Sequence, residues 1–127
     1  IEGQLSTLQL LVSSTGTGLF CPSVPSGANL QKADFSAANF PGCNLSNADF
    51  TDSSFKYANL ENANLANSIL QSTDFTGANL KGANLSGADL YGAYLKDANF
   101  QNADLRGVVG LGNAYQEGAD FTGAIFS

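Results

Sequence analysis

Histidine is absent from the 127-residue sequence, and basic residues are few. The usual pairing of a nucleophile with a base and the commonest zinc ligand are therefore both missing, so we expect no enzyme activity, no catalytic or metal site and no cofactor. Five basic against eleven acidic residues give a net charge of -6, which argues against binding to nucleic acid and against attraction to anionic membranes. No run of about 18 apolar residues occurs, so no segment is expected to insert into a membrane.

Methionine is also absent, and cysteine occurs only twice. The chain opens at Ile1, which indicates a trimmed chain or a mature protein whose targeting segment has been removed. Cys21 and Cys43 are too few for a disulfide scaffold and lack the spacing of metal ligands. Two interpretations of this pair stay open: one disulfide bridge, or two small buried residues that never react.

A five-residue unit dominates the sequence and recurs sixteen times without a gap over residues 28–107. The first position of each unit is a small residue, and the second is usually Asn or Asp. The third position is Leu or Phe, and the last two positions vary more freely. The central residue is Leu or Phe in every copy, from Leu30 to Leu105. This repetition predicts a repeat architecture within one domain. The small residue is alanine in twelve copies, and the exceptions are Cys43, Ser53, Ser68 and Thr73.

The period of five predicts a four-sided coil, because neither a helix nor a flat strand returns every fifth residue to the inside. If each unit forms one side, four units make a coil, and sixteen units make about four coils that stack at roughly 4.8 Å. Twelve of the sixteen corners carry Gly, Asn or Asp, which tolerate positive φ. The same register places Phe35, Phe55 and Phe75 in one inner column. Stacked amides can hydrogen-bond along the columns Asn39, Asn59, Asn79, Asn99 and Asn44, Asn64, Asn84.

Both ends of the repeat block differ from the block itself. Residues 1–27 are predicted to form an N-terminal cap, with a short amphipathic helix from Leu5 to Val12 and a loop that contains Pro22 and Pro25. Residues 108–127 are predicted to be interrupted C-terminal repeats and a cap. The spacing from Leu105 to Phe121 is sixteen rather than fifteen, so one residue is inserted, and a bulge or short helix is expected within 106–118.

The tandem A(D/N)LXX unit resembles the pentapeptide repeat family over about 80 of the 127 residues. The resemblance implies an all-β solenoid, a right-handed quadrilateral β-helix of about four to five coils, here with a short N-terminal capping helix. Most members have no known activity, many occur in cyanobacteria and in the chloroplast thylakoid lumen, and some bacterial members mimic DNA and bind gyrase. A small, acidic, processed chain is most similar to the plant lumenal members, so the resemblance implies that compartment.

The outward positions offer two kinds of candidate site. Asp34 and Asp74, like Asp49 and Asp89, share a face two coils apart, at roughly 10 Å, which favours solvation and turn support over a ligand site. Lys56 and Lys96 flank the first of these pairs, and weak surface ion pairs are expected there. Scattered surface aromatics are common, but an exposed patch can mark a protein partner. The candidate interaction residues are Tyr57, Tyr91 and Tyr94, of which the last two are expected to lie together near the C-terminal end.

The cysteine positions are compatible with a bridge between the cap and the repeats. Cys43 occupies an inward position of the first coil, one coil above position 23, and Cys21 lies two residues from that site. A bridge would close a loop of 22 residues, could contribute about 3 kcal/mol, and would imply an oxidising compartment.

These features lead to three functional hypotheses. The first is a non-enzymatic, monomeric structural or protein-interaction module with an unknown protein partner. The second is a DNA-mimicking inhibitor of a DNA-binding enzyme, although four coils span roughly 20 Å, less than one duplex turn of about 34 Å. The third, compatible with the first, is a redox-responsive protein switched by a disulfide between Cys21 and Cys43.

Overall fold

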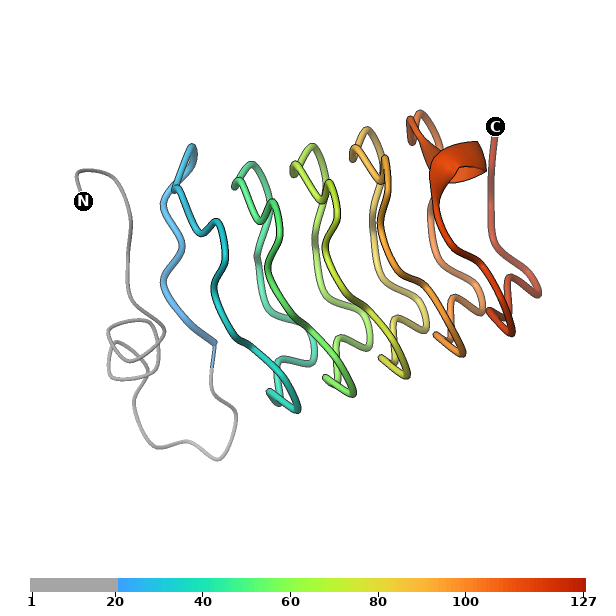
Figure 1. The fold of residues 1–127 in the computed structure, drawn as a ribbon, viewed down its shortest axis with the longest axis horizontal. Coiled ribbons are helices and arrows are strands. Elements are labelled where there is room, and N and C mark those ends of the chain that lie inside the picture. Colours follow the sequence, from blue (N-terminus) through green and yellow to red (C-terminus); the bar gives the residue numbers. More distant parts are fainter. Residues whose placement is uncertain (1–20) are drawn as a thin grey trace.

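The structure is a computed structural model that describes residues 21–127, and the chain winds there into square coils stacked along one axis (Figure 1). The predicted capping helix from Leu5 to Val12 lies outside the described residues. Sixteen isolated parallel β-bridges join each coil to the next, and up to Val109 they link residues that are twenty apart. The four-sided coil predicted from the period of five is therefore confirmed.

The bridges divide the surface into four faces, and each face carries one outward residue per coil. The faces are named here in chain order, and coils one to five begin at residues 28, 48, 68, 88 and 108. The first face carries Asn29, Asp49, Ile69, Asp89 and Val109; the second Asp34, Ser54, Asp74, Tyr94 and Tyr115; the third Asn39, Asn59, Asn79, Asn99 and Asp120; and the fourth Asn44, Asn64, Asn84, Asp104 and Ile125.

The backbone of each repeat is hydrogen-bonded to both neighbouring coils. The second coil shows the pattern: the N–H of Asp49 donates to the carbonyl of Ala28 in the first coil at 2.9 Å, and the N–H of Phe50 donates to the carbonyl of Ile69 in the third coil at 2.8 Å. Most corners are closed by the backbone N–H of the small residue, as where the N–H of Ala58 donates to the carbonyl of Phe55 at 3.0 Å. A backbone that turns every five residues thus keeps its polar groups paired.

All sixteen corners have positive φ, including the four that carry neither Gly, Asn nor Asp. The path of the coil therefore imposes the left-handed conformation whichever residue stands at the corner, although an L side chain is strained there. The φ angles at these four corners are 60° at Lys32, 61° at Ala37, 60° at Tyr57 and 55° at Ser72.

Ala37→Gly is expected to raise the free energy of unfolding by about 0.5 to 1 kcal/mol, because glycine relieves the left-handed strain at an exposed corner. The matched control is Ala66→Gly, because Ala66 does not have a left-handed backbone conformation. This substitution should lower the free energy of unfolding by about 0.5 to 1 kcal/mol. Urea unfolding of both variants measures the difference. Two changes of the same sign would contradict the explanation.

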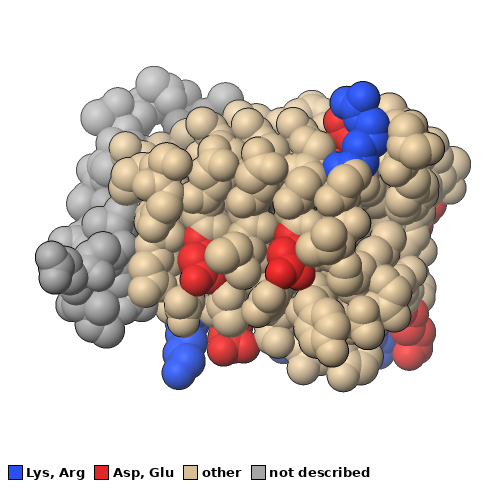
Figure 2. Space-filling model, turned by 90° about the horizontal axis from the view of Figure 1, so that it is seen from above, with Lys and Arg blue, Asp and Glu red and all other residues tan. Residues whose placement is uncertain are grey.

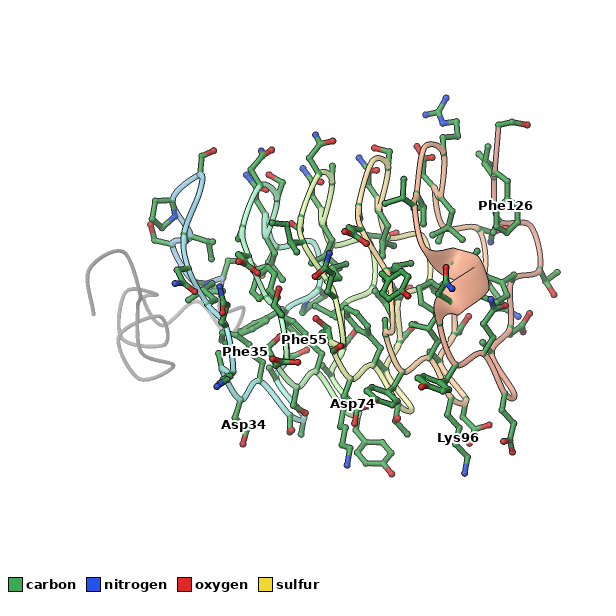
Figure 3. The ribbon with its side chains drawn as sticks, turned by 45° about the horizontal axis from the view of Figure 1, so that its top comes forward. Asp34, Phe35, Phe55, Asp74, Lys96 and Phe126 are labelled. Atoms are coloured by element: carbon green, nitrogen blue, oxygen red, sulfur yellow. A yellow bond between two sulfur atoms is a disulfide. The ribbon has the colours of Figure 1, made fainter. Side chains whose placement is uncertain are left out.

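The interior is filled by the central Leu and Phe side chains and by the small residues beside them. The predicted aromatic column is confirmed: Phe55 stacks on Phe35 with ring centroids 5.1 Å apart and on Phe75 with centroids 5.4 Å apart. Figure 3 shows Phe35 and Phe55 side by side within the coils. Two of the polar exceptions also fit, because the hydroxyls of Ser68 and Thr73 donate to the carbonyls of Leu45 and Phe50.

The predicted amide ladders hold at one position among the described residues, where Asn59 Nδ2 donates to Asn39 Oδ1 at 3.2 Å. Elsewhere the side-chain oxygen before the central residue accepts the backbone N–H two residues later, as Asn79 Oδ1 does from Lys81 at 3.0 Å. Asn39 differs because the residue two positions later is Pro41, which has no N–H. Local turn support thus replaces bonding between rungs.

The predicted insertion is confirmed near the C-terminal end. Val109 still pairs twenty residues back, with Asp89, whereas Tyr115 pairs twenty-one residues back, with Tyr94. The extra residue is accommodated beside the 3-10 helix η1 (Leu111–Asn113), and none of the helices in residues 21–127 is long enough to cross a membrane. Gly110, with φ 79°, precedes η1, and a Cβ there would lie 2.5 Å from the backbone nitrogen of Tyr91.

A partial fifth coil, which contains η1, closes the stack, as the sequence predicts. The ring of Phe121 stacks on that of Phe100 with centroids 5.1 Å apart, so the inner column continues past the insertion. Phe126 lies at the C-terminal end of the stack (Figure 3) and is 51% exposed. Burial of the core therefore decreases towards this end.

Candidate interaction surface

The outward carboxylates are separated from one another, as the sequence predicts. Ser54 stands between Asp34 and Asp74 on the second face, and Ile69 stands between Asp49 and Asp89 on the first. On the face seen in Figure 2 the acidic side chains form isolated spots with uncharged surface between them. Within residues 21–127 no group of three His, Cys, Asp or Glu side chains could hold a metal ion.

Several carboxylates also accept a hydrogen bond from a glutamine of the preceding coil. Gln71 Nε2 donates to Asp89 Oδ2 at 2.7 Å, and Gln101 Nε2 donates to Asp120 Oδ2 at 2.9 Å. A third bond joins Gln31 Nε2 to Asp49 Oδ2 at 2.8 Å. Sequence reasoning missed these bonds, although a glutamine eighteen or nineteen residues before an aspartate was the available signal. The carboxylates therefore support the coil rather than form a reactive site.

Two ion pairs form in the part of the chain that the structure describes. Lys56 Nζ lies 3.7 Å from Asp74 Oδ2, which confirms one predicted pair, and Arg106 Nη2 lies 2.7 Å from Asp104 Oδ2. Lys96 belongs to neither pair, although Figure 3 shows it on the same side of the stack as Asp34 and Asp74. Exposed pairs of this kind contribute about 0 to 1 kcal/mol each.

Stability is expected to decrease in acid because three outward-facing carboxyls are hydrogen-bonded in the folded state. Hydrogen bonds from Ser36 lower the pKa of Asp34, and those from Arg106 and Thr122 lower the pKa values of Asp104 and Asp120. A carboxyl whose pKa is lower in the folded state than in the unfolded state stabilises the fold. This stabilisation is fully present above the unfolded-state pKa of about 3.9 and is lost as the pH falls through the folded-state pKa. In a series of melting temperatures measured from pH 7 to pH 2, the melting temperature should therefore decrease once the pH is below about 4.

The control for this pH dependence replaces the three carboxyls by Asn, a residue that the repeat already uses at the same position. The amide oxygen can still accept the turn hydrogen bond but does not titrate. The variant with Asp34→Asn, Asp104→Asn and Asp120→Asn should lose less of its melting temperature below about pH 4 than the unchanged protein. Identical pH profiles would show that these groups do not cause the loss.

The three candidate tyrosines are all exposed, but they lie in two places. Tyr57 is at a corner of the second coil, where its ring covers Gly77, and a Cβ on Gly77 would lie 2.5 Å from Tyr57 Cδ1. Tyr91 and Tyr94 lie together in the fourth coil and are 57% and 43% exposed. The structure therefore separates Tyr57 from the other two.

A fourth tyrosine joins this aromatic site. The ring of Tyr115 stacks on that of Tyr94, with centroids 4.9 Å apart and an interplanar angle of 6°. Sequence reasoning missed Tyr115 because it lies where the repeat pattern lapses. The one-residue shift between Leu105 and Phe121 was the available signal, since it places Tyr115 one coil after Tyr94.

The exposed apolar side chains gather where the first and second faces meet in coils three to five. We call this surface the apolar corner, and it also borders the half-buried Leu111 of η1. The third and fourth faces carry Asn or Asp at every described outward position before Ile125. Of the eight exposed large hydrophobic residues within residues 21–127, five form the apolar corner: Ile69, Tyr91, Tyr94, Val109 and Tyr115.

A disulfide joins Cys21 to Cys43, with the two sulfur atoms 2.11 Å and the Cα atoms 5.2 Å apart. Cys43 is buried at the small-residue position of the first coil, and Cys21 belongs to the segment that precedes it. Of the two interpretations left open by the sequence, the structure contains the bridge. It fixes residues 21–27 to the first coil across 22 positions of sequence.

Comparison with known proteins gives one family and several solved structures. The profile of the pentapeptide repeats, in eight copies, matches residues 28–67, 58–97 and 73–109. A pentapeptide repeat protein of the Arabidopsis thaliana thylakoid lumen is 37% identical, with a TM-score of 0.69 over 74% of this chain and 63% of that chain. This chain thus spans less than two thirds of the Arabidopsis protein. No protein with a curated description matches.

Two other solved structures are more distant. A pentapeptide repeat protein of the cyanobacterium Cyanothece 51142 is 30% identical, with a TM-score of 0.40 over 80% of this chain and 86% of that chain. The plasmid-mediated fluoroquinolone resistance protein QnrB1 is 16% identical, with a TM-score of 0.45 over 95% of this chain and 55% of its own.

Proposed function

This chain belongs to the pentapeptide repeat family, whose members fold as right-handed quadrilateral β-helices, and from that premise we propose that it is a non-enzymatic protein-interaction module of the thylakoid lumen. The apolar corner is the proposed binding surface for a protein partner. The observation that carries this proposal is the gathering of five exposed apolar side chains at one edge of an otherwise polar coil.

The cost of exposing these side chains supports a role for the apolar corner. The repeat readily places Asn or Asp at the same outward position, as on the third and fourth faces, so the fold does not require Tyr94, Val109 or Tyr115 there. Exposed apolar surface that a fold does not need often marks a site of protein interaction. The stacked rings of Tyr94 and Tyr115 would offer a rigid surface to the partner.

The proposed compartment rests on two observations. The Arabidopsis relative comes from the thylakoid lumen. The disulfide between Cys21 and Cys43 is the kind of bond that persists in an oxidising compartment. We propose that the protein is a monomer there, that it does not bind nucleic acid and that it does not insert into a membrane.

The other two hypotheses have different support. The DNA-mimicking alternative lacks a specific observation in its favour, and five stacked coils separated by roughly 4.8 Å are shorter than one duplex turn of about 34 Å. The redox-responsive alternative gains the disulfide as a switchable bond. It is compatible with the proposed function, because reduction would act at the opposite end of the stack from the apolar corner.

Site-specific photo-crosslinking tests the proposed function. A photoreactive phenylalanine analogue replaces Tyr91 in one sample and Gln101, the matched corner residue between the third and fourth faces, in another. After irradiation in a thylakoid lumen extract, discrete protein adducts are expected from position 91 only, identified by mass spectrometry. Equal adducts from both positions, or none from position 91, would reject the apolar corner as the binding surface.

A further inference from the structure

We propose that the apolar corner receives an arginine-bearing segment of its protein partner. This inference rests on the proposed function and specifies the chemistry of the partner at the same surface. It follows from which side chains the coil register places next to the exposed tyrosines.

Two carboxylates lie within the apolar corner. On the second face, Asp74 pairs directly with Tyr94, so its carboxylate precedes the stacked rings of Tyr94 and Tyr115 by one coil. On the first face, Asp89 lies between Ile69 and Val109, and its Oδ1 accepts the N–H of Tyr91 at 3.0 Å. Each carboxylate therefore lies one coil, about 4.8 Å, from an exposed apolar or aromatic residue of the same face.

Cations are absent from the outward and corner positions that make up this surface. The flanking cations are Lys56, whose Nζ is 3.7 Å from Asp74 Oδ2, Lys96, and Arg106, which pairs with Asp104. The protein as a whole is acidic, with a net charge of -6. A basic partner therefore complements both the local surface and the total charge.

Arginine matches this combination of groups better than lysine does. Its planar guanidinium can stack on an aromatic ring and also donate two parallel hydrogen bonds to a carboxylate, whereas the lysine ammonium is a compact and strongly hydrated charge. Its methylene stem can cover Ile69 or Val109 while the charged group remains at the carboxylate. The bond that Asp89 Oδ2 already accepts from Gln71 holds that carboxylate in place for the incoming group.

The experiment uses two short blocked peptides, Arg-Gly-Arg-Gly-Arg and Lys-Gly-Lys-Gly-Lys, titrated into the ¹⁵N-labelled protein at low salt. Backbone signals of Tyr91, Tyr94 and Tyr115 should shift saturably, with the arginine peptide bound roughly two- to fivefold more tightly than the lysine peptide. Asp74→Asn with Asp89→Asn should weaken arginine binding by about two- to fivefold. This variant retains the fold because Asn serves the same turn elsewhere, whereas Asp104→Asn on the fourth face is the control and should leave binding unchanged.

Equal binding of the two peptides, or shifts that are as large at Asn79 and Asn99 of the third face, would overturn the arginine proposal. An excess of the arginine peptide, added as a competitor in the photo-crosslinking experiment, distinguishes failure of the arginine proposal from failure of the proposed function. If adducts form from position 91 but an excess of the arginine peptide does not suppress them, a protein partner binds without arginine. If no adduct forms from position 91, the proposed function itself fails. Suppression by the arginine peptide alone supports both.

Discussion

Phe55→Ala is expected to lower the free energy of unfolding by about 3 to 5 kcal/mol, the largest effect that a single substitution should have on this fold. Phe55 is fully buried, stacks on Phe35 and Phe75, and makes an edge contact with Phe50 at 5.3 Å between centroids. Its removal would leave a cavity in the middle of the aromatic column. The neighbouring coils cannot close that cavity, because the β-bridges fix their separation.

Phe126→Ala is the matched control for the aromatic column. Phe126 is half exposed at the end of the stack, where truncation opens no enclosed cavity, so we expect a loss below about 1 kcal/mol. Urea unfolding, followed by circular dichroism, compares the two variants. A loss at Phe55 no larger than that at Phe126 would show that the inner column does not hold the coils together.

Loss of the disulfide is expected to cost about 3 kcal/mol, because the bond closes a loop of 22 residues in the unfolded chain. The variant Cys21→Ser with Cys43→Ala removes it with little other disturbance. Position 43 is an interior small-residue position at which twelve of the sixteen repeats already carry alanine. Unfolding with and without reductant should show the loss in the unchanged protein and no response in the variant.

Hydrogen exchange tests the redox hypothesis in the same samples. The N–H of Gly27 donates to the carbonyl of Asn47 at 2.6 Å. This bond connects the segment after Cys21 to the end of the first coil. If reduction switches the protein, protection of Gly27 should fall while that of Leu80, in the middle of the stack, stays unchanged. Unchanged protection at Gly27 after complete reduction would reject a disulfide-controlled switch.

The inward positions of this protein could be predicted from the sequence because the same pattern of small and large apolar residues recurs in sixteen repeats. The period of five fixes which residues face the core, so the column of Phe35, Phe55 and Phe75 and the insertion before Tyr115 follow from counting. Positive φ could be predicted at the corners that carry Gly, Asn or Asp. Left-handed conformations at Lys32 and Tyr57 could not be predicted, because the global coil overrides their local preference.

The outward positions were harder to predict because their contacts depend on exact register and on competition for hydrogen bonds. Amide ladders gave way to local turns, since a backbone N–H two residues away is closer to the side-chain oxygen than the next coil is. The apolar corner was foreseen only through Tyr91 and Tyr94. Tyr115 joins it through the one-residue insertion, and Ile69 and Val109 join it through the stacking of the first face.

The central claim, that one corner of the coil is the binding surface, is tested most directly by mapping signal loss on the ¹⁵N-labelled protein in a thylakoid lumen extract. Association with a protein partner broadens the amide signals at the contact. We predict selective broadening at Tyr91, Tyr94 and Tyr115, with the signals of Asn79 and Asn99 on the third face unaffected. Selective broadening on the third or fourth face, or uniform signals at all four faces, would contradict the claim.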